Sequence, residues 1–356
     1  MLSAAIVGLP QTGKTTVFNL VTHARLAVDR FATGRIDTHR RAAQVPDPRL
    51  QWLEERFHPR KVTHAQIEFI DAPGLAPGAS QGAGLGNRFL ADIRGVDALV
   101  HVLAAFEGPA PFLPPVEAAE ALELELGFSD LELIERRLER IAQGKRPREH
   151  ETEAEALRAC AHHLESGQRL ETLELPAESW QVLSGIQFLT RKPMVYMVNG
   201  DEGVLRGEYE GRKALETFAA QRQIPVVAVS AAIESEIDAL DEPERSDFLQ
   251  DLGIRESGIA RLARVTYEQL GLISFLTAGP DEVRAWPVPR GIRARAAAGK
   301  IHSDIERGFI RAEVVAFADL QRAGNMARAR EAGVVRLEGK DYPIADGDVI
   351  EFRFNV

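Results

Sequence analysis

The sequence predicts an α/β protein whose first part is a P-loop nucleotide-binding fold, and three observations support this prediction. The segment Gly8–Thr15 fits the pattern G-x-x-x-x-G-K-[ST], which is the signature of a phosphate-binding loop. The apolar run Ala4–Val7 precedes this segment, and a helix-like segment, Lys14–Thr22, follows it. A later apolar run, Ile67–Ile70, ends in the D-x-x-G sequence Asp71–Gly74, as expected for a nucleotide site built on neighbouring strands.

The P-loop supplies the residues expected to hold the phosphates. Its two glycines let the backbone bend so that N–H groups face a phosphate, and the helix N-terminus adds partial positive charge. Lys14 is expected to reach the β- and γ-phosphates, and the Thr15 hydroxyl is expected to ligate Mg²⁺. The nucleotide-binding residues predicted in this loop are Gln11, Thr12, Gly13, Lys14, Thr15 and Thr16.

The D-x-x-G sequence is expected to sense the third phosphate. Asp71 at the tip of its strand can hold Mg²⁺ through water, and the Gly74 N–H can bind the γ-phosphate. Leu75 stands where many GTPases place a glutamine that orients the attacking water. Because leucine cannot orient water, hydrolysis is expected to depend on another group or to be slow until a partner helps.

A second pair of strands is expected to carry the nucleobase site. The run Met194–Val198 leads into Asn199, Gly200, Asp201 and Glu202, where GTPases use N-K-x-D. Glutamate is one methylene longer than aspartate, so its paired hydrogen bonds to guanine should be lost, and a site without them discriminates poorly. This argues for ATP or mixed use. The strand Val226–Val229 then delivers the base-contacting residues Ser230 and Ala231.

Composition limits the classes of protein that remain. Hydrophobic residues make up 45% of the 356 residues, which is ample for real cores, and the single cysteine, Cys160, excludes a disulfide framework and a cysteine-based zinc site. Met1 leads directly into a predicted core strand, and no apolar run is long enough to span a bilayer. We therefore expect a soluble, cytoplasmic protein that does not use a membrane.

The net charge of −10 is unevenly distributed. Glu117–Glu178 holds 16 acidic residues against 8 basic ones, and its two helical runs, separated by a break at Gly144–Pro147, indicate an antiparallel pair of helices. No carboxylate lies between Glu282 and Asp304, a stretch that contains four arginines and a lysine. This basic stretch, residues 284–300, is either a solvated face or a contact for RNA.

Several longer motifs resemble one family, the YchF or Obg-like ATPases, a branch of the P-loop GTPases that prefers ATP. The resemblance covers nearly the whole chain and is weakest from about Pro109 to Thr190. The segments that carry it are Ile6–Pro10, Pro46–Leu50, Gly78–Asn87, Asn199–Glu202, Thr277–Gly279, Glu282–Trp286, Gly308–Val314, Leu337–Tyr342 and Gly347–Val356.

The resemblance implies three parts. Residues 1–112 and 190–272 would form a discontinuous P-loop GTPase-like domain, residues 113–189 a helical insertion, and residues 273–356 a C-terminal TGS domain of ubiquitin-like β-grasp fold. It also implies ATP or GTP with Mg²⁺ as ligands, ribosome association through the large subunit, a regulatory role in translation or stress, and a monomer.

Two departures from the family pattern affect the site. Gln11 replaces an asparagine that in related proteins helps to hold a potassium ion, which puts potassium dependence in doubt. The family's magnesium-binding threonine of the first switch falls on Arg35, which cannot ligate Mg²⁺. One interpretation is that γ-phosphate sensing has been lost. Another is that Thr38 takes the metal in a shifted register and Arg35 acts as a cis arginine finger. A third is that Arg35 is a surface residue on a loop, with Thr33 or Thr38 as the metal ligand.

Three functional hypotheses follow from these residues. The first is an ATP-binding, slowly hydrolysing switch protein in which Lys14, Thr15 and Gly74, with Arg35 as a further candidate, carry the phosphoryl chemistry, and Thr15 and Asp71, with Thr38 as a further candidate, carry the metal. The second is a module on the ribosome that binds nucleotide without hydrolysing it. The third is a conventional GTPase, which would require Glu202 to do the work of an aspartate.

Overall fold

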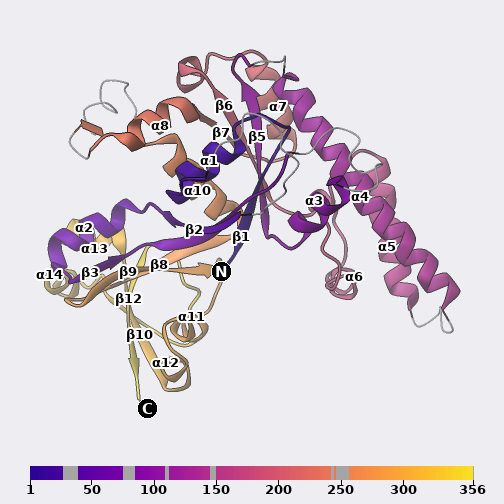
Figure 1. Cartoon of the computed structure of the whole chain (residues 1–356). Helices are drawn as coiled ribbons and strands as arrows, with labels where there is room; N and C mark the ends of the chain where they lie inside the picture. Colours follow the sequence, from indigo (N-terminus) through magenta and orange to yellow (C-terminus); the bar gives the residue numbers. More distant parts are fainter. Residues whose placement is uncertain are drawn as a thin grey trace. The chain divides into compact units, whose positions relative to one another are not determined.

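The computed structural model describes residues 1–26, 39–74, 85–108, 112–144, 150–241, 244–245 and 256–355, with backbone only for 85–88. The chain divides into two compact units, Leu2–Arg41 with Glu68–Thr266, and Met1 with Ala42–Ile67 and Tyr267–Val356. Figure 1 shows the elements of both units along the chain. Each unit is α/β, which confirms the predicted fold class.

The first unit contains a six-stranded sheet in the order β2-β4-β1-β5-β6-β7. β1 pairs in parallel with β4 and β5, β5 pairs in parallel with β6, and β6 pairs in parallel with β7. Because β1, β5 and β6 are buried on both faces, their sequences are nearly continuous apolar runs. The strands are β1 (Ser3–Val7), β2 (His39–Val45), β4 (Ala65–Asp71), β5 (Ala98–Ala105), β6 (Met194–Gly200) and β7 (Val226–Val229).

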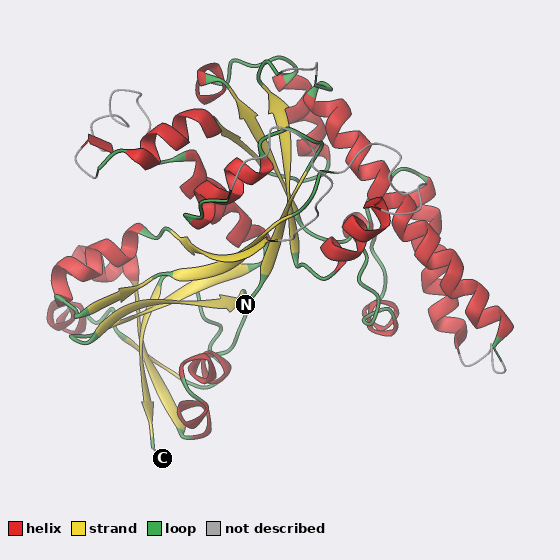
Figure 2. Ribbon diagram, viewed as in Figure 1, coloured by secondary structure: helices red, strands yellow, loops and turns green. Residues whose placement is uncertain are grey.

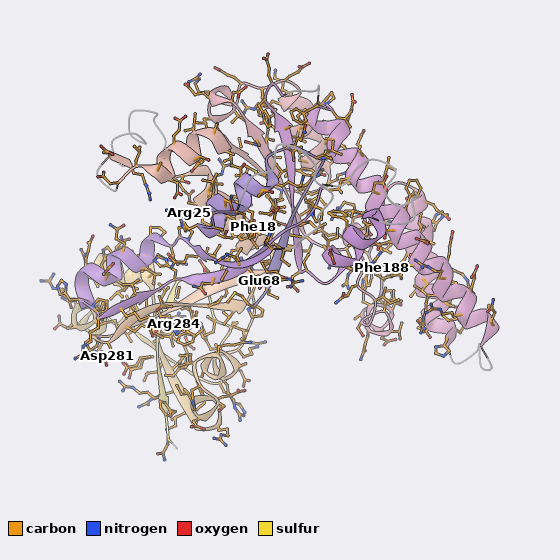
Figure 3. All side chains as sticks on the ribbon, in the orientation of Figure 1. Phe18, Arg25, Glu68, Phe188, Asp281 and Arg284 are labelled. Carbon is orange, nitrogen blue, oxygen red and sulfur yellow. The ribbon has the colours of Figure 1, made fainter. Side chains whose placement is uncertain are left out.

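Helices flank this sheet in the alternating order expected of a parallel α/β fold (Figure 2). The predicted helix over Lys14–Thr22 is present with those bounds as α1. The fully buried Phe18 of α1 belongs to the core beside the sheet (Figure 3). The remaining helices are α3 (Leu85–Arg94), α4 (Pro115–Gln143), α5 (Glu151–Glu165), α6 (Ala177–Val182), α7 (Arg212–Gln221), α8 (Ala231–Ala239) and α10 (Gly258–Gln269), with 3₁₀ turns η2 (Leu170–Thr172) and η3 (Glu202–Arg206).

The predicted pair of helices is α4 and α5, which lie side by side (Figure 1). The N-terminal half of α4 packs Ala119, Leu122 and Leu126 into the core of the sheet, and its C-terminal half packs Ile134 and Ile141 against α5. One helix therefore serves two cores, which explains its length of 29 residues.

A buried carboxylate holds α4 in place. Asp130, which is fully buried, accepts hydrogen bonds from the Leu189 and Thr190 backbone N–H groups at 3.1 and 2.8 Å. It also accepts the Thr190 hydroxyl at 2.8 Å and forms an ion pair with Arg94 at 2.8 Å. These donors replace the water molecules that the Asp130 carboxylate loses on burial. Because they come from fixed positions, they hold α4 in a single orientation on the unit.

The second unit contains another six-stranded sheet, in the order β11-β10-β12-β8-β9-β3. Small residues of a short helix, Ala294, Ala297 and Ala298, pack with Phe275 and Val314 in its core. Its elements are α2 (Pro48–Phe57), β3 (Lys61–Thr63), β8 (Leu272–Ala278), β9 (Glu282–Pro289), α11 (Ala294–Ile301), α12 (Ser303–Arg307), β10 (Phe309–Ala316), α13 (Phe317–Ala323), α14 (Met326–Glu331), β11 (Arg336–Glu338) and β12 (Asp348–Phe354).

This division differs from the boundaries suggested by the sequence, which placed residues 42–67 in the nucleotide domain. In the structure β3 pairs in parallel with β9, and α2 packs against β9, so residues 42–67 join the unit that contains the C-terminal sheet. The helices of residues 113–189 group with the sheet of the first unit. The three-part division, with a TGS domain at 273–356, stays a prediction.

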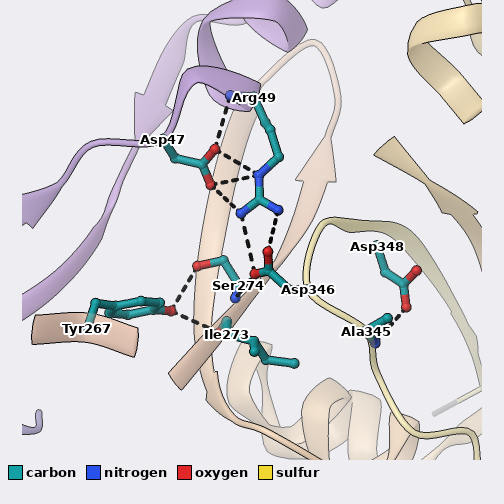
Figure 4. A network of polar contacts seen from close by, with 8 residues as sticks. All are labelled: Asp47, Arg49, Tyr267, Ile273, Ser274, Ala345, Asp346 and Asp348. Carbon is teal, nitrogen blue, oxygen red and sulfur yellow. Dashed lines mark hydrogen bonds and ion pairs between the residues drawn. The ribbon is translucent and has the colours of Figure 1, made fainter. Parts of the chain in front are cut away.

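Arg49 fastens α2 to the C-terminal strands (Figure 4). Asp47 caps α2 by accepting the Arg49 N–H at 3.0 Å, and its carboxylate also binds the Arg49 guanidinium at 2.7 and 2.8 Å. The same guanidinium binds Asp346 at 2.7 Å, and Asp346 accepts the Ser274 N–H at 2.9 Å. A Cβ added to Gly347 would lie 2.6 Å from this guanidinium, which explains a glycine there.

Replacing Arg49 with lysine should destabilise the second unit by about 1–2 kcal/mol, because a point charge cannot bridge two carboxylates with a planar fork. The measurement is denaturant unfolding followed by tryptophan fluorescence, since Trp52 of α2 packs against Phe317 within this unit. The matched control is Arg56→Lys on the same helix, whose only described ion pair is with its exposed neighbour Glu55. Equal unfolding midpoints for the two variants would contradict this role of Arg49.

Within the described residues, no helix combines the length and the apolar composition that crossing a membrane requires.

Candidate functional site

The P-loop connects β1 to α1 at the carboxyl edge of the parallel sheet. Gly8 adopts a φ of 147° and Gly13 a φ of 93°, conformations that L side chains rarely adopt. A Cβ on Gly8 would lie 2.6 Å from the Val102 carbonyl oxygen, and a Cβ on Gly13 would collide with the Asn199 amide. The predicted need for both glycines therefore has a steric cause as well as a conformational one.

The first turn of α1 is suited to bind an anion. Gly13 is its N-cap residue, and no side chain among the described residues caps it. Its first N–H groups are therefore available for phosphate oxygens, where the helix dipole favours negative charge. The preceding Gln11 is exposed and left-handed at φ 64°, a conformation that asparagine tolerates better than glutamine.

Lys14, Thr15 and Asp71 lie together, as the sequence predicts. The Thr15 hydroxyl donates to the Asp71 carboxylate at 2.9 Å, and the Lys14 ammonium donates to the Leu9 carbonyl at 2.7 Å. The other Asp71 oxygen, Oδ1, is buried and has no hydrogen-bond partner among the described residues. A hydroxyl beside a carboxylate with an unused oxygen is the donor set that Mg²⁺ takes from proteins, with water and phosphate completing its shell. Thr15 and Asp71 therefore fit the metal.

Burial changes the charge balance of these residues. Desolvation lowers the pKa of Lys14 from its usual 10.5 to about 8, although the Asp71 carboxylate partly opposes this shift. Desolvation also raises the pKa of Asp71, against the hydrogen bond from Thr15 and the charge of Lys14. Both groups thus favour their neutral forms more than they would in water, and a charged ligand that compensates this loss should bind strongly.

Gly74 follows β4 by three residues and lies against the P-loop. A Cβ added to it would meet the Pro10 Cα at 3.0 Å, so the D-x-x-G and G-x-x-x-x-G-K-T sequences are in contact through a glycine and a proline. Arg35, Thr38 and Leu75 lie outside the described residues.

Asn199 joins three segments of the site. Its side-chain N–H donates to the Thr12 carbonyl at 3.0 Å, and its side-chain oxygen accepts the Ala231 N–H at 3.0 Å. The residue is 5% exposed, so both bonds form away from solvent. The sequence predicts Asn199 as a nucleotide-binding residue, and in the structure its side chain binds the backbone of the P-loop and of the first residue of α8.

The same edge of the sheet carries three more predicted site residues, which are Gly200, Glu202 and Ser230. A Cβ on Gly200 would lie 2.8 Å from the Val204 Cβ, which explains why the lysine of N-K-x-D is replaced by glycine. The Ser230 hydroxyl is buried without a hydrogen-bond partner among the described residues. The exposed Glu202 begins η3 and forms an ion pair with Arg206 at 2.6 Å.

Sequence reasoning missed Arg206. The available signal was an opposite charge four residues after Glu202, a spacing at which side chains meet on a helical turn. Arg206 also approaches Glu208 at 3.4 Å. The acidic group at the expected nucleobase position is therefore paired with a cation.

A strand, a phosphate-binding loop and a helix, with a D-x-x-G sequence at the tip of the adjacent strand, define a P-loop nucleotide-binding protein of the GTPase-like class. A family model described as a 50S ribosome-binding GTPase matches residues 3–126. A model for the C-terminal domain of YchF GTPases, described as a protein of unknown function, matches residues 272–355.

Full-length relatives specify the family. The chain is 42% identical to a ribosome-binding ATPase YchF of Bacillus subtilis over 364 residues, covering 100% of both chains. It is 39% identical to a protein of the same name from Escherichia coli O157:H7, covering 99% of this chain and 98% of that one. The solved structure of the Schizosaccharomyces pombe YchF GTPase superposes with a TM-score of 0.84 at 28% identity, covering 99% and 97%. The chain belongs to the YchF family.

Nucleotide affinity should fall about tenfold between pH 7 and pH 9. With a pKa of about 8, the free Lys14 is about nine-tenths charged at pH 7 and about one-tenth charged at pH 9. Bound phosphates raise this pKa, so binding takes up a proton and weakens as the pH rises. Titration calorimetry at pH 8 in two buffers of different ionisation enthalpy measures this uptake. The control is the exposed Lys213→Met, and binding without proton uptake would contradict the assignment.

Proposed function

We propose that this chain is a Mg²⁺-dependent, ATP-binding and slowly hydrolysing switch protein that associates with the ribosome. The observation that carries the proposal is the cluster of Lys14, Thr15 and Asp71 under the uncapped N-terminus of α1. Relatives that match the whole chain are named ribosome-binding ATPases, which supports the nucleotide and the ribosome as partners.

The catalytic residues would act by position and charge. Lys14 would leave the Leu9 carbonyl and donate to the β- and γ-phosphates, while N–H groups of Gly13 and Gly74 bind their oxygens. Thr15 and Asp71 would hold Mg²⁺, which when bound would neutralise phosphate charge. Leu75 cannot orient water, so intrinsic turnover would be slow. Arg35 as an arginine finger and Thr38 as a metal ligand remain proposals, whereas Gln11 argues against potassium dependence.

Preference for ATP rests on the nucleobase side. Glu202 is paired with Arg206, and Gly200 replaces the lysine that would flank the base. The site therefore lacks the unpaired aspartate carboxylate that accepts hydrogen bonds from guanine in GTPases. GTP is the second candidate, because the solved yeast relative is described as a GTPase.

The C-terminal unit would contribute to ribosome binding as a TGS domain, and the basic stretch 284–300 would contact RNA. Three arginines of this stretch also make contacts within the chain. Arg284 stacks on Trp286 at 3.9 Å. Arg293 donates to the Asp341 carbonyl, and Arg295 donates to the Glu306 carbonyl. The large-subunit contact, the monomeric state and a cytoplasmic location belong to the same proposal.

Fluorescent ATP and GTP analogues should bind with ATP tighter by about tenfold or more, a difference of about 1.4 kcal/mol. Hydrolysis should be slow and should rise when purified ribosomes are added. Lys14→Ala should abolish tight binding of both nucleotides and serves as the site-specific control. Tighter GTP binding would make the protein a GTPase, and binding without turnover on ribosomes would make it a non-hydrolysing module.

Replacing Glu202 with aspartate should raise the affinity for GTP relative to ATP by about tenfold, because the shorter carboxylate regains the paired contact with guanine and no longer reaches Arg206. The ratio of the two dissociation constants is the measurement. Glu208→Asp is the matched control, since Glu208 is exposed and contacts the same arginine at 3.4 Å. An unchanged ratio in the Glu202 variant would remove this residue from base selection.

A further inference from the structure

Helix α4 carries two large apolar side chains that the described protein leaves uncovered. Leu124 is 58% exposed and Phe128 is 48% exposed. They are four residues apart on one helix, so they lie next to each other on the same face. Exposed apolar residues scattered singly are ordinary, but an adjacent pair on a fixed helix is a small apolar surface.

The opposite side of α4 is fixed to the unit, so the pair cannot turn inward. Glu123 accepts the Tyr196 hydroxyl at 2.8 Å and the Arg222 guanidinium at 3.0 Å. Asp130 is held by its four donors from the neighbouring segments. Glu123 lies directly before Leu124 and Asp130 lies two residues after Phe128, so these anchors fix the rotation of the helix between them.

The apolar pair is surrounded by negative charge. From Glu117 to Glu135 the sequence has seven carboxylates and no lysine or arginine. Four of them, Glu117, Glu120, Glu132 and Glu135, are exposed. Glu132 forms an ion pair with Arg136 at 3.4 Å, whereas the other three form none within the part of the chain that the structure describes.

Gly127 lies between the two apolar residues in the interior of this long helix. Glycine weakens a helix interior relative to alanine, so its presence calls for a reason. No atom lies within 4 Å of a Cβ added there, so the packing of the described residues does not require glycine. Bare backbone at this position permits another molecule to approach the helix closely beside Phe128.

We propose that this surface, the α4 patch of Leu124, Gly127 and Phe128 with Glu117, Glu120 and Glu135, docks a basic protein segment. An apolar side chain of that segment would lie between Leu124 and Phe128, and its lysines or arginines would face the glutamates. RNA and a second copy of the patch are disfavoured because both would bring negative charge to negative charge. The inference rests on the proposed function and assigns the segment to a protein of the ribosome.

The direct test is co-sedimentation with purified bacterial ribosomes, using the full chain with a non-hydrolysable ATP analogue and with ADP. The double variant Leu124→Ser, Phe128→Ser should bind about tenfold or more weakly, as expected for the apolar centre of an interface. Its basal ATP hydrolysis should match the unmodified protein. Val182→Ser, which changes a 45% exposed residue of α6, is the matched control and should bind normally.

The outcomes separate this inference from the proposed function. If the unmodified protein does not bind ribosomes in either nucleotide state, both fail. If it binds and the double variant binds equally well, the α4 patch is not the docking surface, while the proposed function stands.

Gly127→Ala gives a second test that loss of folding cannot explain. Outside the helix's own backbone, the added methyl group meets no atom of the described residues, so the melting temperature should rise by about 1–3 °C. Ribosome binding should nevertheless weaken, because the methyl group occupies the space of the partner. A variant that is more stable and binds unchanged would overturn close approach at this residue.

The chemistry of the partner can be read directly. A photo-crosslinking phenylalanine analogue at position 124 should label a basic ribosomal protein on purified ribosomes. Labelling of ribosomal RNA alone, or no labelling of a bound complex, would overturn the proposal. Binding should weaken as salt rises, and Glu120→Gln with Glu135→Gln should reduce that salt dependence.

Discussion

The site depends on one constraint, the parallel pairing of β1 with β4 and β5, and of β5 with β6 and β6 with β7. Parallel strands place their carboxyl ends at one edge, so loops far apart in the sequence become neighbours there. Ile6 pairs with Asp71 and Asn199 pairs with Val229, which brings the P-loop, the D-x-x-G sequence and both loops expected at the nucleobase to that edge. Asn199 then ties these loops together by its bonds to Thr12 and Ala231, although Thr12 is 187 residues away.

The same edge holds charges in an environment that does not solvate them well. Lys14 and Asp71 lose hydration on burial, and their mutual attraction offsets only part of that loss. The pKa of Lys14 is therefore lowered and the pKa of Asp71 is raised, so burial favours the neutral form of each group. A site in this condition is prepared for a ligand that brings both signs of charge, such as a triphosphate with its metal. Binding energy then comes from groups that are already in position, which is the general condition for phosphoryl chemistry without covalent catalysis.

The sequence predicted the parts of the fold whose signals are local. The P-loop, the bounds of α1 and the helix pair α4 and α5 follow from motif and periodicity. The place of residues 42–67 could not be predicted, because β3 has three residues and pairs with β9, which begins more than 200 positions later. Arg49 and Asp346 are likewise 297 positions apart, so no local pattern indicates that they meet. At the site, individual roles followed from motifs, but the ion pair that occupies Glu202 required the structure.

Helix α4 shows why composition alone does not assign a role to charge. Its acidic residues are chemically alike, yet Asp130 is buried under four donors and Glu123 is bonded to Tyr196 and Arg222, whereas Glu117, Glu120 and Glu135 point to solvent. The face of the helix on which a carboxylate lies determines whether it is buried or exposed, because a carboxylate is stable in the interior only where hydrogen-bond donors contact it. The inward carboxylates thus fix the helix and account for part of its charge. The outward ones contribute nothing to that anchoring, and with Leu124 and Phe128 beside them they form a surface whose complement is a cationic chain with an apolar side chain.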